Sequence, residues 1–113
     1  MKEDCIYLLH ISEAITDIQC YVAGGKDAFY SNKMIQDAVI RNLEIIGEAV
    51  KNISPVTRNH APEVPWKKIA GLRDVLIHEY FGIDLDTVWL VVENRLPLLS
   101  RQISMLLQKE ENQ

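Results

Sequence analysis

Hydrophobic residues recur along most of the chain with the three- and four-residue spacing of an amphipathic helix. The first stripe ends before Gly24 and Gly25, which predicts a helix that stops at this pair of glycines. A second stripe follows Ser31, a candidate N-cap, and predicts a helix to about residue 53. The two stripes consist of Leu8, Ile11, Ile15, Ile18 and Val22, and of Ile35, Val39, Asn42, Ile46, Ala49 and Ile53.

Proline and glycine mark the next boundaries. Three prolines between residues 54 and 65 predict a loop there, because proline lacks the amide donor that helices and strands use. A third helix is predicted from about Trp66 to about Tyr80. Gly82 and Asp84 then predict a turn followed by a new N-cap.

The last stripe predicts a long C-terminal helix that is kinked or split near Pro97. Its residues are Leu85, Trp89, Val92, Leu96, Leu99, Ile103 and Leu106. No segment alternates apolar and polar residues as a half-buried strand would. The chain is therefore predicted to be all-α, an antiparallel four- to five-helix bundle forming one domain over residues 1–113. Gly47 and Gly71, inside predicted helices, are expected to let two helices approach closely.

Composition narrows the choice of partners. Hydrophobic residues make up 48% of the chain, which is ample for a small core and leaves apolar surface for a partner. The net charge of −4 opposes a protein that coats nucleic acid over a whole face, so we expect no DNA partner and only a local contact with RNA. Cys5 and Cys20 lie about 22 Å apart on the first predicted helix and cannot bridge each other. Unpaired cysteines, with no signal peptide or membrane-spanning apolar run, predict a cytoplasmic protein without a membrane partner.

Several polar residues interrupt one of the most apolar stretches of the chain, residues 71–82, and four of them are candidates for function. They are Arg73, Asp74, His78 and Tyr80. A buried arginine or histidine costs free energy unless it is paired, so a core helix does not usually carry both. A purely structural role stays open for each: His78 as a buried core histidine, Arg73 as an ion-pair partner of Asp74 or of a glutamate across the bundle, and Tyr80 as a core residue.

The chemistry of this segment suits the cleavage of a phosphodiester. Histidine transfers protons readily because its unperturbed pKa is about 6.5, and arginine provides a permanent cation for phosphate oxygens. Asp74 precedes His78 by four residues and shares its helix face, so it can orient the imidazole. Five residues along a helix leave Arg73 and His78 about 140° apart around the axis. One helix alone is therefore a poor site, and we expect a homodimer, or a multiple of it, formed through the central helices.

Other polar residues give weaker indications of a functional site. His10, Glu13 and Asp17 fall at helix spacings that could hold a metal ion, but such sets are common on solvated helix faces, so no metal site is predicted. Lys67 and Lys68 are basic residues close to the polar segment in sequence and could guide RNA. Solvent-facing lysines without such a role are the ordinary alternative.

Several blocks of the sequence, in order, resemble the HepT-like branch of the HEPN superfamily of metal-independent ribonucleases. The resemblance covers almost all of the chain from about Asn32 onward. The blocks are residues 41–49 (RNLEIIGEA), 64–66 (VPW), 69–74 (IAGLRD), 78–84 (HEYFGID), 88–89 (VW) and 96–97 (LP). The run of matches in order, with the tyrosine in place, is far more specific than the Arg–x4–His spacing by itself.

The resemblance implies that the chain is the toxin half of a toxin–antitoxin pair, a metal-independent endoribonuclease that uses no cofactor. In this interpretation Arg73 binds phosphate, His78 transfers protons and Asp74 orients or tunes the histidine. The implied partners are RNA as substrate and a minimal nucleotidyltransferase antitoxin, which transfers AMP onto the motif tyrosine, here Tyr80. The alternative is a non-catalytic subunit that binds a nucleotide or presents substrate to the nucleotidyltransferase. Glu79 stands where small or neutral residues are common in the family.

Overall fold

The computed structural model describes the backbone of residues 2–78 and 84–111 and the side chains of residues 3–72 and 84–110. Within these residues the chain forms helices and no strand, which confirms the all-α prediction. The elements are α1 (Lys2–Tyr21), α2 (Lys26–Ser31), α3 (Lys33–Lys51), α4 (Pro55–Asn59), α5 (Trp66–His78), α6 (Leu85–Leu90), the π-helical turn η1 (Val91–Arg95) and α7 (Leu96–Glu111).

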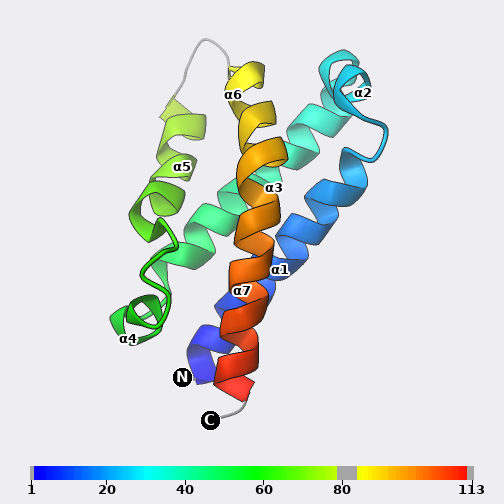
Figure 1. Ribbon diagram of the computed structural model, residues 1–113. Helices are drawn as coiled ribbons and strands as arrows, with labels where there is room; N and C mark the ends of the chain where they lie inside the picture. Colours follow the sequence, from blue (N-terminus) through cyan, green and yellow to red (C-terminus); the bar gives the residue numbers. More distant parts are fainter. Residues whose placement is uncertain (1, 79–83, 112–113) are drawn as a thin grey trace.

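Four long helical segments form the bundle. They are α1, α3, α5 and the uninterrupted run from α6 through η1 to α7. Figure 1 shows successive long segments running in opposite directions along one axis, with both ends of the chain at the same end of the molecule. Helix α5 packs on α3, and α1 packs on both α3 and α7. The predicted antiparallel helical bundle is therefore confirmed.

The core is built from the stripes that the sequence predicts. Side chains of all three stripes are fully buried where the long helices meet, because one face of each amphipathic helix is removed from water. The most deeply buried of them are Leu8, Ile11, Ile15, Ile18, Val39, Ile46, Ile103 and Leu106. Asn42, the polar member of the second stripe, is also buried, and its Nδ2 donates to the carbonyl of Ala38 at 2.9 Å.

The short helix α2 was not predicted from the sequence. It begins after Gly25, whose φ of 93° lies in the left-handed region that favours glycine. Phe29 anchors it, because this side chain is fully buried and its ring lies 5.3 Å from that of Trp89. Ser31 ends α2 and is not the cap of the next helix. That cap is Asn32, whose side-chain oxygen accepts from the amide of Ile35 at 3.2 Å.

The prediction of a loop between residues 54 and 65 was wrong over residues 55–59, which form α4. Ser54 is its N-cap and accepts from the amide of Thr57 at 3.4 Å. Pro55 occupies the first helical turn, where a missing amide donor costs nothing. Proline at the first helical position is therefore compatible with a helix, and here it marks where α4 begins.

The last long segment, from α6 through η1 to α7, departs from regular α-helix close to Pro97, where the sequence predicts a kink or a split. A π-helical turn, η1, ends at Arg95, two residues before Pro97. Proline cannot donate to the carbonyl four residues earlier, and a wider turn accommodates the missing hydrogen bond. The indole nitrogen of Trp89 donates to Oε2 of Glu93 at 3.1 Å and ties α6 to this turn.

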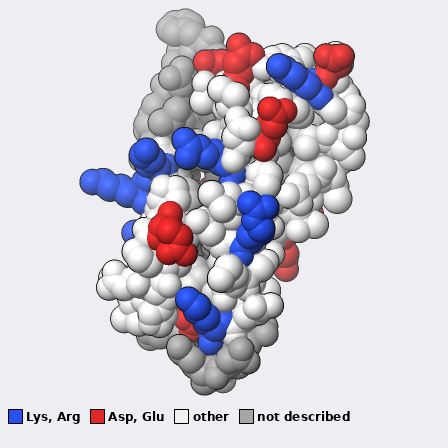
Figure 2. Space-filling view, viewed as in Figure 1, with Lys and Arg blue, Asp and Glu red and all other residues white. Residues whose placement is uncertain are grey.

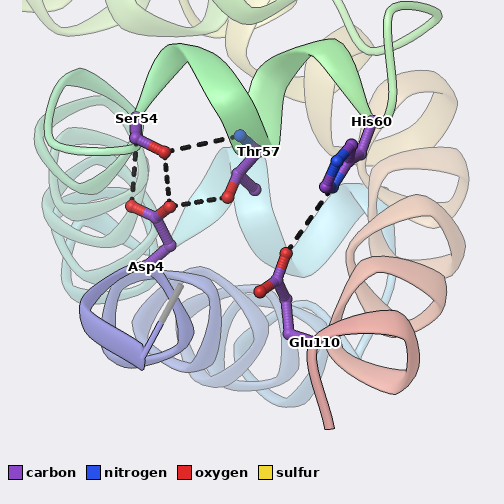
Figure 3. Close-up of polar contacts among 5 residues, drawn as sticks. All are labelled: Asp4, Ser54, Thr57, His60 and Glu110. Carbon is purple, nitrogen blue, oxygen red and sulfur yellow. Dashed lines mark hydrogen bonds and ion pairs between the residues drawn. The ribbon is translucent and has the colours of Figure 1, made fainter. Parts of the chain in front are cut away.

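A buried carboxylate joins α1 to α4 (Figure 3). Oδ2 of Asp4 accepts from the hydroxyls of Ser54 and Thr57, each at 2.6 Å, and Oδ1 accepts from the amide of Ser54 at 3.0 Å. Burial opposes ionisation, but these hydrogen bonds outweigh it and hold the pKa of Asp4 below its ordinary value. At the other end of α4, Nδ1 of His60 lies 3.8 Å from Oε1 of Glu110 in α7. The short helix thus contacts both the first and the last helix.

Replacing Asp4 with asparagine is expected to lower the free energy of unfolding by about 1–3 kcal/mol at neutral pH, because hydrogen bonds to a buried charge are lost. A carboxyl whose pKa is depressed on folding stabilises the protein above its unfolded pKa of about 3.9. That contribution disappears as pH falls through the folded pKa. Urea unfolding should therefore show the difference between the two proteins shrinking in acid.

Asp17→Asn is the matched control, since Asp17 is an exposed aspartate on the same helix. An equal loss of stability in this control would show that the effect comes from net charge and not from the buried contact.

Candidate functional site on α5

The polar segment singled out in the sequence lies on α5 and beyond it. Arg73 and Asp74 occupy the C-terminal half of the helix, and His78 is its last residue. Their side chains lie outside the described residues, and so does the whole of Tyr80. The roles assigned to these four residues therefore stay predictions, and the surroundings of the helix are what the structure contributes.

The N-terminal end of α5 is firmly anchored. Trp66, its first residue, is buried, and its indole nitrogen donates to the carbonyl of Ala61 at 3.0 Å. Val64 is also buried, and its amide bonds back to Ala61 at 3.1 Å. Ile69 and Leu72 pack against the core, and the helix lies along α3 (Figure 1). These contacts fix the direction in which α5 carries the polar segment.

Gly71 does not serve the close approach that the sequence suggested. A Cβ built on it would meet no atom of the described residues within 4 Å. Gly47, the other glycine of that prediction, is buried on α3. Among the described residues, the surface of α5 at Gly71 is therefore open, next to the turn that carries Arg73.

A groove runs between α5 and the η1–α7 segment and reaches down to α3. Its cavity measures about 420 Å³, within the range of small-molecule sites. The walls are mainly aliphatic, and charged or amide side chains complete the lining. The apolar residues are Leu43, Ile46, Pro65, Ile69, Leu72, Val91, Leu96, Leu98 and Leu99; the polar ones are Glu63, Lys68, Arg95 and Gln102. Sequence reasoning missed this groove, because its walls come from three separate parts of the chain.

Basic side chains gather on the face that contains α5 and α7. Figure 2 shows Lys and Arg across the middle of this face with acidic side chains interspersed, whereas Asp and Glu are more frequent near its upper end, over α6 and α2. The exposed residues Lys67, Lys68, Arg95 and Arg101 come from α5, η1 and α7. A chain with a net charge of −4 thus carries a local basic region beside the candidate helix.

The start of α6 is well capped. Asp84 accepts from the amide of Asp86 at 3.0 Å and from the hydroxyl of Thr87 at 2.9 Å, and the latter bond is the main reason why its pKa is lowered. The Tyr30 hydroxyl donates to Asp86, and chiefly this bond raises the pKa of Tyr30 to about 12. These contacts hold the first turn of α6 in place.

A second, more polar cavity of about 250 Å³ lies between α1 and α3 and includes His10 and Arg41. Arg41 is 3.5 Å from Glu44, which therefore has a partner on its own helix. Among the residues that the structure describes, no group of three or more His, Cys, Asp or Glu side chains is arranged to hold a metal ion. None of the described helices combines the length and apolar character needed to cross a membrane.

Fold and segment together define a helical bundle in which one packed helix carries an Arg–x4–His sequence next to an open groove. The family model described as "Ribonuclease HepT-like" matches residues 11–106, and the chain belongs to this family.

Three relatives illustrate the similarity. A Methanocaldococcus jannaschii protein named "Gamma-glutamylcyclotransferase and putative RNase" is 43% identical over 111 residues, which are 96% of this chain and 50% of that protein. A "Putative RNase" of Caldanaerobacter subterraneus subsp. tengcongensis is 41% identical over 98% of this chain and 100% of its own length. A "Probable ribonuclease HepT" of Thermococcus cleftensis is 42% identical over 88% of this chain and 92% of its own length. The chain thus spans half of the first relative and nearly all of the other two. No solved structure gives a significant match.

Proposed function

We propose that this protein is a metal-independent endoribonuclease and the toxin half of a toxin–antitoxin pair. Membership of the HepT-like family supports the reaction class. The structural observation that carries the proposal is the position of α5, which holds the Arg73–His78 segment beside an open surface and a local basic region.

The proposed reaction needs no metal. His78 removes the proton of a 2′-hydroxyl, and the 2′-oxygen attacks the adjacent phosphorus while the bond to the 5′-oxygen breaks. The products are a 2′,3′-cyclic phosphate and a 5′-hydroxyl, which takes up a proton as it leaves. Arg73 would stabilise the negative charge that develops on the phosphorane oxygens. Asp74, one helical turn before His78, would keep the imidazole oriented.

Such a reaction needs one group to accept a proton and another to donate one. A two-fold homodimer would supply both, because it brings two copies of His78 and Arg73 to one cleft. The angle of about 140° between the two positions on one helix supports this arrangement, since a single copy cannot direct both side chains at one phosphate. The open surface of α5 at Gly71 leaves room for a second copy to approach.

The decisive experiment separates the chain from its partner and assays RNA cleavage in EDTA across a size-exclusion profile with light scattering. Cleavage is expected to follow the dimer, or a multiple of it, and to be insensitive to the chelator. Strict dependence on a divalent metal, or activity confined to a stable monomer, would contradict the proposed mechanism. A folded dimer that cuts no RNA would instead favour the alternative, a non-catalytic subunit of a nucleotidyltransferase complex.

The proposed partner is a minimal nucleotidyltransferase antitoxin that transfers AMP to Tyr80. A phosphodiester anion added two residues after His78 would compete with RNA phosphate for Arg73 and would block the cleft by its bulk. Such a modification would neutralise the toxin without degrading it.

A further inference from the structure

The groove between α5 and the η1–α7 segment has a lining that suits a partly apolar ligand. Its apolar walls come from three separate stretches of the chain. These are Leu43 and Ile46 of α3, then Pro65, Ile69 and Leu72 at and within α5, and Val91, Leu96, Leu98 and Leu99 of the η1–α7 segment. Leu98, at the mouth, is 49% exposed, so the apolar surface continues out to solvent. Aliphatic side chains on opposite walls can enclose a planar ring by dispersion and burial.

Two cations and one carboxylate, that of Glu63, line this groove. Lys68 of α5 and Arg95 of η1 both contribute to it. Neither forms an ion pair with any described residue, since the pairs found there join other side chains. Because no described side chain pairs with these two cations, a groove with apolar walls is complementary here to a ligand with an apolar ring and a nearby negative charge.

Two further polar groups in the lining suit the edge of a nucleobase. The amide of Gln102 can both donate and accept, and the carboxylate of Glu63 accepts. Glutamine pairs well with adenine, and a carboxylate accepts from the exocyclic amino group of cytosine. An amino-bearing base would therefore match this pair better than uracil does.

The groove is adjacent to the proposed catalytic segment. Arg73 follows Ile69, a wall residue, by four positions, which is about 6 Å along the axis of α5. A nucleotide in the groove would therefore lie about one helical turn from the proposed phosphate-binding position. This distance suits neighbouring nucleotides of one RNA strand.

We infer that this groove binds one nucleotide of the RNA strand, next to the scissile phosphate, with its base between the apolar walls and its phosphate at Lys68 and Arg95. The inference rests on the proposed ribonuclease function and adds a specificity site to it. A second copy of the chain is the competing occupant. The charged and amide side chains favour RNA, because charged residues are depleted from the buried centre of protein interfaces.

The test measures binding of a short 2′-O-methyl oligonucleotide, which lacks the attacking hydroxyl and so binds without being cut. Lys68→Ala and Arg95→Ala are each expected to weaken binding by about two- to tenfold. Each should also lower the slope of log Kd against log salt by roughly 0.7, the value for one lost phosphate contact to a single strand. Leu98→Ser should weaken binding with no change in that slope, and oligomers of adenine or cytosine should bind more tightly than those of uracil.

The chain offers a matched control for each variant. Lys67→Ala and Arg101→Ala remove the same charge from exposed positions on the same face, and Met105→Ser removes an exposed apolar side chain from α7. None of these three residues lines the groove. Equal weakening in variants and controls would overturn the inference, because a diffuse electrostatic field would then explain the binding.

Two other outcomes are equally informative. If the groove variants convert the protein to monomers under light scattering, the groove is an interface between copies and the inference fails. If the wild-type protein binds the oligonucleotide and the groove variants weaken it, the inference stands even when natural RNA is not cleaved. In that case only the proposed catalytic function fails, so the two proposals are tested separately.

Discussion

Replacing His78 with alanine is expected to abolish RNA cleavage while the protein remains a folded helical dimer. General acid–base groups typically contribute a factor of about 10²–10⁴, so the remaining activity should be close to background. His78 is the last residue of α5, where alanine is compatible with the helix. The measurements are single-turnover cleavage of RNA in EDTA, far-ultraviolet circular dichroism and light scattering on the same preparation.

Arg73→Ala provides the comparison that assigns the two roles. Loss of the phosphate-binding cation should reduce RNA affinity as well as the rate, whereas His78→Ala should act mainly on the rate. Arg73→Lys should recover only part of the activity, because a single ammonium group cannot form the paired hydrogen bonds of a guanidinium. Unfolding of the His78→Ala protein under conditions in which the wild type is stable would show that this histidine is a core residue.

Replacing Tyr80 with phenylalanine is expected to eliminate AMP transfer to this chain completely. The reaction joins the phenolic oxygen to the α-phosphate of ATP and releases pyrophosphate, so a ring without the hydroxyl cannot accept the group. Intact-mass spectrometry of the wild-type protein, incubated with the proposed partner nucleotidyltransferase and ATP, should show AMP additions in the Tyr80 peptide. RNA cleavage should fall in proportion to the modified fraction.

Tyr21→Phe is the matched control, since Tyr21 is 40% exposed at the end of α1 and is available to the same enzyme. It should be modified at Tyr80 as fully as the wild type. Full neutralisation of a toxic Tyr80→Phe protein by the partner, with no adduct on any residue, would contradict the proposed regulation. The antitoxin would then act by covering the surface of the toxin.

The fold could be predicted largely from the sequence because helix formation and burial follow local periodicity. The hydrophobic stripes at Leu8, Ile18, Val39 and Ile103 identify buried faces, and those faces are buried in the structure. The short helices α2 and α4 escaped this reasoning, because segments of five or six residues have no stripe and are unstable in isolation. They form where Phe29 packs against Trp89 and where Asp4 contacts Ser54.

The candidate site, like the fold, was predictable from the sequence only in part. The Arg73–His78 spacing, the angle between the two positions and the family resemblance follow from the sequence alone, because they depend on neighbouring residues of one helix. The groove does not, since it combines α3, α5 and the η1–α7 segment. The sequence also suggested close packing at Gly71, whereas the surface there is open. Which helix faces meet, and which remain open to a ligand or a second copy, depends on contacts between residues far apart in the chain, and only the tertiary structure decides them.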